Sequence, residues 1–253
     1  MKRMIITLVL VLLGAISALA QAKPDADKKP AAPMPTVDQV MENFVKAIGG
    51  KEAGMKVTSR VQKGTLEIAA MGVNAPIELY AKAPNKSLFF LDVPSYGIIQ
   101  EGFDGTAAWA QEPQGGLRDK TGAELAETKL DGQFYKNLRL KELYSKLELS
   151  GVESVGGRDA YVIVCTPTGG SPEKFYFDKE NGLLVRHDFE RESPMGRSPT
   201  QQFLTDYKEV DGMKVPHTIR NIGAMGEMTI KFTEIKQNVP IDDAKFNKPA
   251  AKP

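Results

Sequence analysis

The residues that could carry out acyl transfer match a catalytic pattern only in part. Segment 171–174 (SPEK) has Ser-x-x-Lys spacing and segment 120–122 is Lys-Thr-Gly, two elements typical of penicillin-binding acyltransferases. Their order is reversed, a Ser-Asp-Asn element is missing, and Ser171 precedes an expected strand where the nucleophile needs a helix start. The sequence also lacks phosphate-binding loops and a nucleophile elbow. We therefore expect no enzyme, with a hydrolase of dispersed site residues as the remote alternative.

Metal ligands and reactive thiols are also scarce. His187 and His217 are the only histidines, and neither has a second histidine or a cysteine at zinc-binding spacing. Segment 178–182 (DKENG) resembles a calcium loop, but its glycine and glutamate are out of register, so a hairpin turn explains it better. Cys165 ends the apolar run 161–165 (YVIVC), which indicates a buried structural thiol. We expect neither a metal nor another cofactor.

The elements that must position these side chains are mostly strands. Apolar and polar residues alternate between about residues 57 and 110 and again after residue 147, as in half-buried strands. Hairpin turns are indicated by glycine-containing pairs at 104–105, 156–157, 181–182 and 211–212. The runs number roughly ten to twelve, and a sheet of that size usually curls. We predict a mainly β fold, an antiparallel half-open barrel with one face in water.

Alternation also assigns particular side chains to particular faces. Val185, His187 and Phe189 are expected on one face of their strand, which makes His187 a partly buried residue and not a metal ligand. Phe203 and Tyr207 are likewise expected on one face of theirs. Apolar residues placed in this way form the predicted interior.

Helices are indicated at two places in the folded region. Thr36 followed by Gln39 is a capping box, apolar residues then recur at helical spacing as far as Ile48, and Gly49 and Gly50 supply the stop. Segments 123–127 and 138–143 also have a helical pattern, with a break near Gly132. We expect these helices to pack against the concave face of the sheet, and segment 240–246 to form a last turn.

The ends of the chain have the composition of segments outside the fold. Residues 1–20 begin with Lys2 and Arg3, continue with an apolar run and end in Ala-Leu-Ala, as in a cleaved secretory signal peptide. Residues 21–35 are rich in Ala, Lys and Pro, as in a disordered linker. We expect one domain over residues 36–248, a tail over 249–253, and a periplasmic protein without a lipid anchor, because the signal does not end at a cysteine.

The net charge of +1 excludes some partners. Nucleic acids are bound by clustered Lys and Arg residues, and anionic lipid surfaces by polybasic segments, whereas this chain has 33 basic and 32 acidic residues. We therefore expect no nucleic acid partner. The length of the chain allows a sizeable core without disulfides, and a monomer is expected.

The order of features resembles that of the LolA-type lipoprotein-sorting proteins and of the wider lipoprotein-carrier superfamily with its LolB-like and LppX-like members. The resemblance rests on EGFDG at 101–105 followed by Trp109, FYFD at 175–178 with GLLVR at 182–186, and segment 206–216. It implies an unclosed β-barrel with a helical lid and an apolar interior that accepts acyl chains. It implies no catalytic residues.

The leading hypothesis from the sequence is thus a periplasmic carrier of lipoprotein acyl chains or other lipids, served by an envelope donor or acceptor protein. The alternative is a non-catalytic interaction domain of the same fold whose interior is filled. The apolar strand residues expected to line the cavity are Leu79, Phe89, Leu91, Trp109, Phe175, Phe177, Phe189, Phe203 and Ile230.

Overall fold

The computed structural model describes residues 33–168, 170–193, 196–224 and 226–250. The expected signal peptide, nearly all of the linker and the last three residues of the tail lie outside the described residues. Residues Pro35–Pro253 form one compact unit, and the following paragraphs concern its described part.

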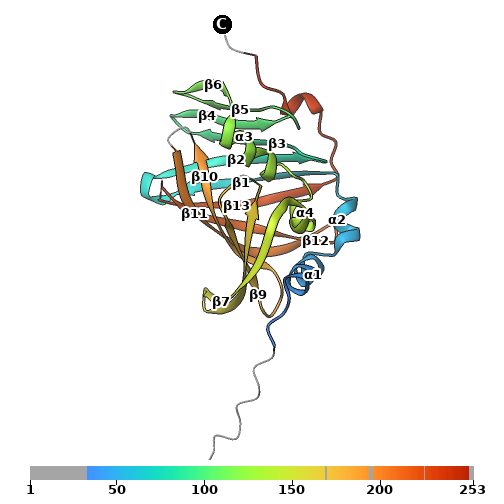
Figure 1. Ribbon diagram of the computed structural model, residues 1–253. Helices are drawn as coiled ribbons and strands as arrows, with labels where there is room; N and C mark the ends of the chain where they lie inside the picture. The colour runs from blue at the N-terminus through green and yellow to red at the C-terminus, as the bar shows by residue number, and fades with distance from the viewer. Residues whose placement is uncertain (1–32, 169, 194–195, 225, 251–253) are drawn as a thin grey trace, which may run out of the picture. The chain divides into compact units, whose positions relative to one another are not determined.

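A single antiparallel sheet dominates this unit (Figure 1). Its order across the sheet is β6-β5-β4-β3-β2-β1-β13-β12-β11-β10-β9-β8-β7. The strands are β1 (Ser59–Ile68), β2 (Val73–Lys82), β3 (Lys86–Val93), β4 (Gly97–Phe103), β5 (Ala108–Glu112), β6 (Gly116–Asp119), β7 (Tyr144–Val155), β8 (Arg158–Pro167), β9 (Glu173–Asp178), β10 (Leu184–Ser193), β11 (Gly196–Val210), β12 (Met213–Gly223) and β13 (Gly226–Gln237).

The predicted fold class is confirmed: the fold is mainly β, and the sheet is antiparallel and not closed. The sheet has thirteen strands, one more than the upper expectation. The short edge strand β6 (GLRD) has Leu117 as its only apolar residue, so its sequence shows no alternation. Because β6 and β7 are consecutive in the chain but lie at opposite edges, the segment between them must cross from one edge to the other.

Helices form that crossing segment, and two further helices precede the first strand. The crossing contains α3 (Gly122–Asp131), the 3-10 turn η2 (Lys136–Leu138) and α4 (Leu140–Leu143), which agrees with the helical patterns in the sequence. Helix α1 (Val37–Ala47) begins with the predicted capping box, in which the backbone N–H of Gln39 donates to Thr36 Oγ1 at 3.2 Å. The short helix α2 (Lys51–Lys56) was not predicted; it follows Gly49, where a Cβ would lie 2.2 Å from the Gly212 carbonyl oxygen.

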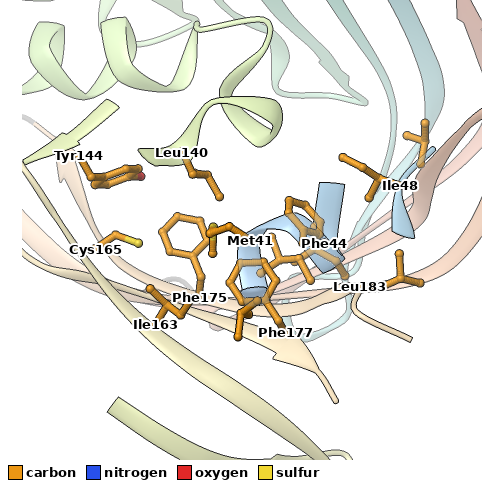
Figure 2. Packing of buried hydrophobic residues seen from close by; sticks show 14 of the residues in the cluster. Met41, Phe44, Ile48, Leu140, Tyr144, Ile163, Cys165, Phe175, Phe177 and Leu183 are labelled. Carbon is orange, nitrogen blue, oxygen red and sulfur yellow. The ribbon is translucent and has the colours of Figure 1, made fainter. Parts of the chain in front are cut away.

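Helix α1 buries its apolar face against strands β7 to β11. We name the result the helix-covered cluster (Figure 2). Phe44 is 1% exposed, and its ring centroid lies 5.1 Å from that of Phe177. The buried members are Val40, Met41, Phe44, Ile48, Val57, Leu140, Tyr144, Ile163, Cys165, Phe175, Phe177, Leu183, Leu184, Leu204, Met213 and Val215. We call this face of the sheet the inner face.

The opposite, outer face is not simply exposed to water, which corrects the sequence expectation. The segment after β13, including the 3-10 turn η3 (Asp243–Phe246), packs on it and buries Val61, Leu88, Trp109, Ile241 and Phe246. The Trp109 indole Nε1 donates to the Phe246 carbonyl oxygen at 3.0 Å. Lys82 and Lys86 both pair with Asp243, at 2.7 and 2.9 Å. The predicted last turn is therefore a cover for the outer face.

Candidate ligand-binding site

A second apolar cluster lies on the inner face, away from α1. It is built by β1, β2, β3, β4, β12 and β13, whose register sets Leu66 against Ile230 and Ile77 against Leu91. Its buried members are Leu66, Ile68, Ala75, Ile77, Leu91, Ile230 and Phe232, and its partly buried members are Val73, Leu79, Phe89, Val93, Ile99, Ile219, Met228 and Ile235. We name this set the open cluster.

The open cluster differs from the helix-covered cluster in what lies on it. All of its members come from strands, and α1, α3 and α4 contribute none. Eight of its fifteen members are only partly buried, Phe89 and Leu79 among them. The turns beside it carry further exposed apolar side chains, since Met71 is 64% and Tyr96 43% exposed. The cluster is thus an apolar surface that the described chain does not seal.

Helix α3 is attached beside this surface by ion pairs. On one side Arg118 of β6 makes two hydrogen bonds to Glu124, at 2.7 and 2.8 Å. On the other side Arg191 of β10 pairs with Glu127 at 3.0 Å, and the Glu192 amide donates to the same carboxylate. No residue of α3 is buried. The helix therefore bridges two distant strands of the sheet, and it contributes no residue to the open cluster.

The predicted cavity residues divide into four groups. Leu79, Phe89, Leu91 and Ile230 belong to the open cluster, whereas Phe175 and Phe177 lie in the helix-covered cluster against α1. Phe189 is on the inner face as well, stacked on His187 with a centroid distance of 4.6 Å. The structure brings these seven to one face of the sheet, and it places Trp109 and Phe203 on the other face.

Phe203 lies on the outer face because its neighbour Leu204 is opposite Ile219 and occupies the inner face. Its ring packs between the guanidinium groups of Arg186 and Arg220, at 5.5 and 4.3 Å from the ring centroid. Leu204 and Tyr207 both pack in the helix-covered cluster, and between them Asp206 has a φ of 52°. A left-handed residue inside a strand interrupts the two-residue period. The expectation that Phe203 and Tyr207 share a face is therefore wrong.

Trp109 lies on the outer face because its neighbours Ala108 and Ala110 occupy the inward positions of β5. Its indole ring lies over Gly102, its partner across the sheet, where an added Cβ would come within 2.4 Å of the ring.

An irregularity of strand β10 separates Val185 from His187. The β9–β10 register shifts between Leu184 and Arg186, and Val185 packs with the outer cluster around Tyr176. The expectation that Val185 shares a face with His187 and Phe189 is therefore wrong, and the sequence revealed neither this register shift nor the orientation of Trp109.

A buried polar network lies at the border of the helix-covered cluster. His187 Nε2 lies 2.7 Å from Glu173 Oε2, and the Tyr144 hydroxyl donates to the same oxygen at 2.9 Å. Lys136 pairs with Asp131 at 2.8 Å. Burial lowers the pKa of His187, although its contact with Glu173 acts in the opposite direction. His187 therefore takes up a proton at a lower pH than a free imidazole does.

Cys165 belongs to the same interior and has the predicted character. It is fully buried, and burial raises the pKa of its thiol to about 12. A thiol with such a pKa carries almost no thiolate at neutral pH and is a poor nucleophile. Among the described residues, no three His, Cys, Asp or Glu side chains are grouped to hold a metal ion.

Two inner-face residues that the sequence did not reveal lie between the clusters. Arg60 of β1 pairs with Gln237 of β13 and with Ala81 of β2. Arg60 Nε and both polar side-chain atoms of Gln237 are buried without a hydrogen-bond partner. The ring of Phe134, in the crossing segment, lies 5.8 Å from the Arg60 guanidinium carbon. Burial lowers the pKa of Arg60.

Two hollows lie elsewhere on the described surface. One, of about 460 Å³, is lined by α1 and the turn after β9, including Asn43, Lys46 and Lys179. The other, of about 360 Å³, lies beside α2 and Asp211. Both are open and mostly polar, so neither offers an apolar ligand the surface that the open cluster provides. None of the described helices is long and apolar enough to cross a membrane.

Comparison with known proteins identifies the fold. No protein-family model and no curated protein matches the sequence. A DUF1329 family protein from Desulfovibrio piger superposes with a TM-score of 0.57 at 17% identity, covering 85% of this chain and 98% of that one. A LolA superfamily protein from Nitrosomonas europaea superposes with a TM-score of 0.55 at 14% identity, covering 85% and 99%.

A third solved structure, a putative outer membrane lipoprotein-sorting protein domain from Vibrio parahaemolyticus, superposes with a TM-score of 0.51 at 15% identity and covers 76% of this chain and 90% of that one. At such identities the agreement concerns the fold. The chain has the unclosed, helix-covered β-sheet fold of the LolA superfamily, the family that its sequence resembles.

Proposed function

We propose that this protein is a carrier that binds acyl chains of lipoproteins or of other lipids on the open cluster and moves them through the periplasm towards the outer membrane. The observation that carries this proposal is the partial exposure of an apolar inner face to which no helix contributes a residue. Apolar patches of this kind on soluble proteins mark binding surfaces. The fold shared with a lipoprotein-sorting domain supports the same role.

The energetics favour an acyl chain as the ligand. Burying one methylene group contributes about 0.8 kcal/mol, so a long chain laid on the open cluster gains affinity without polar recognition. The helix-covered half of the inner face is already packed by α1, with Phe44 and Phe177 each 1% exposed. The binding surface is therefore the half built by β1 to β4, β12 and β13.

Two neighbouring phenylalanines provide a matched test of this surface. Phe89 belongs to the open cluster, whereas Phe90, the next residue of β3, points to the outer face between Glu78 and Gln100. Delipidated protein should bind a fluorescent fatty-acid analogue saturably. Phe89→Asp should weaken that binding roughly tenfold or more, since a charge is costly to bury beside an acyl chain. Phe90→Asp should leave it unchanged.

The natural cargo can be sought directly. The purified protein is extracted with organic solvent and the extract is analysed by mass spectrometry, with the Phe89→Asp variant prepared in parallel. We expect an acyl lipid in stoichiometric amount from the wild type and a reduced amount from the variant. Lack of saturable binding, together with an extract free of lipid, would overturn the proposal and favour an interaction domain.

A further inference from the structure

Arg60 and Gln237 carry buried polar side-chain atoms that the described fold leaves without hydrogen-bond partners. Arg60 is partly buried, and its Nε is fully so; a charge in such a position is normally compensated by an opposite charge or by hydrogen bonds. Among the described residues no carboxylate pairs with the Arg60 guanidinium, and its Nε lacks any acceptor. Gln237 is 7% exposed, and both its donor and its acceptor are unsatisfied. An external group that supplies the missing partners would remove this cost.

The chemistry of the two side chains defines that group. A guanidinium offers N–H donors in a planar fork that suits carboxylate and phosphate oxygens. Gln237 adds an amide donor from the neighbouring strand, directly opposite Arg60 in the register. Donors converging from two strands next to a fixed positive charge favour an anionic oxygen ligand over an uncharged one.

The position of the pair connects it with the open cluster. Gln62, two residues further along β1, pairs with Leu79 on one side and Ile235 on the other, and both of these belong to the open cluster. Two strand residues span about 7 Å. An amphiphile with its head at Arg60 therefore has apolar surface within reach of its first methylene groups and onward to Leu66 and Ile68.

The crossing segment closes the other side of the pair. Phe134 lies next to the Arg60 guanidinium, and its amide donates to the Pro84 carbonyl oxygen at 3.0 Å. The hydroxyl of Tyr135 donates to the Val57 carbonyl oxygen at 3.1 Å. These two bonds hold Phe134 beside the Arg60 guanidinium, and an apolar neighbour of this kind strengthens a charge-assisted hydrogen bond.

We propose that Arg60 and Gln237 bind the oxyanion group, a carboxylate or a phosphate, of an amphiphile whose acyl chain lies along the open cluster. This inference rests on the proposed function and makes it more specific, because it selects acidic lipids over neutral ones. Arg60 is the principal anchor, and Gln237 orients the head group.

The test compares three ligands with one acyl chain: palmitate, 1-palmitoyl-lysophosphatidate and uncharged 1-palmitoylglycerol. Each displaces the neutral fluorophore Nile red from the delipidated full chain. Arg60→Gln should weaken the anionic ligands roughly tenfold to hundredfold and leave 1-palmitoylglycerol unchanged, as expected for loss of a hydrogen bond to a charged group. Gln237→Leu should weaken them by roughly threefold to tenfold. The anion that loses more identifies the source of the oxyanion.

A matched control is Arg220→Gln, which removes an arginine from the outer face and should change none of the three affinities. The midpoint of thermal unfolding of Arg60→Gln should not fall, since no carboxylate among the described residues pairs with the guanidinium and its buried Nε has no acceptor. A lower midpoint would assign Arg60 a structural role and contradict the anchor. Equal losses for charged and uncharged ligands, or none, would also overturn it while leaving acyl-chain binding intact. Failure of the wild type to bind any of the three would overturn the proposed function as well.

Discussion

The two halves of the inner face consist of the same kind of strand but differ in their cover. Over β7 to β11, the amphipathic helix α1 inserts Val40, Met41 and Phe44 into the sheet and makes that half a core. Over the other half, α3 buries no residue and is attached through Glu124 and Glu127. Ion pairs whose arginines are partly exposed, as Arg118 and Arg191 are, contribute only modestly to stability. The comparison teaches that an apolar strand face becomes core or binding surface according to the helix that lies on it.

Truncating one aromatic in each half should reveal the largest difference. Phe44→Ala removes a ring that is 1% exposed and packed on Phe177, and should cost about 3–5 kcal/mol in the free energy of unfolding. Phe89→Ala removes a partly buried ring of the open cluster, and should cost about 2 kcal/mol or less because no packed cavity is created. Urea unfolding of both variants checks this. Equal losses would mean that both halves are packed alike.

Enlarging one residue in each half tests the same contrast in the other direction. Ile163 is fully buried in the helix-covered cluster, so Ile163→Phe should overpack it and cost about 1–3 kcal/mol in the free energy of unfolding. Leu79 is partly buried in the open cluster, so Leu79→Phe should stay within about 0.5 kcal/mol of the wild type. A strong destabilisation by Leu79→Phe would show that the open half has no room for a larger side chain.

Lowering the pH should destabilise the folded protein through the protonation of His187, which borders the helix-covered cluster. Burial holds the pKa of folded His187 below its unfolded value of about 6.5, so the unfolded state binds the proton first. Stability should therefore be constant above that pH and fall below it, by at most about 1.4 kcal/mol per pH unit for one proton. Groups facing His187 are Glu173 on β9, Lys136 in η2 and Asp131 on α3.

The matched variant is His187→Gln, which cannot take up the proton and should flatten the pH dependence between neutral pH and the onset of carboxylate protonation. Chemical unfolding measured over this range checks both proteins. A slope of the same size in His187→Gln would assign the effect to another group.

The helix caps should give the smallest difference. The Thr36 side chain accepts from the Gln39 amide at the start of α1, and Thr36→Ala should cost about 1 kcal/mol. Thr121 at the start of α3 has no such side-chain bond, and Thr121→Ala should change stability by a few tenths of a kcal/mol at most. Thermal unfolding of the two variants compares them. A larger effect at Thr121 would show that the N-terminus of α3 contributes more to stability than the N-terminus of α1.

The sequence predicted the sheet, the turns and helix α1 because each depends on local chemistry. Thr36 and Gln39 cap α1 as their spacing requires, and the glycine-containing turn at 181–182 connects β9 with β10. The faces were harder to predict. Phe203 was misplaced because one left-handed residue, Asp206, breaks a period that no pattern of residue types reveals.

The candidate site was predicted only in its apolar part. Phe89 and Leu91 follow the alternation of β3 to the inner face, whereas Trp109 was misplaced because the cover of Ile241 and Phe246 comes from a segment more than 130 residues further along the chain. Arg60 and Gln237 could not be found, because their pairing depends on the register of β1 with β13. Non-local pairing of this kind is absent from local sequence patterns.

The position of the β1–β13 pairing in the sheet has a consequence for folding in the cell. Strands β1 and β13, the first and the last of the described strands, pair at the centre of the sheet, so Leu66 finds Ile230 only when the chain is present as far as β13. Contacts so distant in sequence form late and slowly. Until then the central strands remain unpaired and prone to aggregation, and a chain truncated before β13 would stay a substrate for chaperones and proteases.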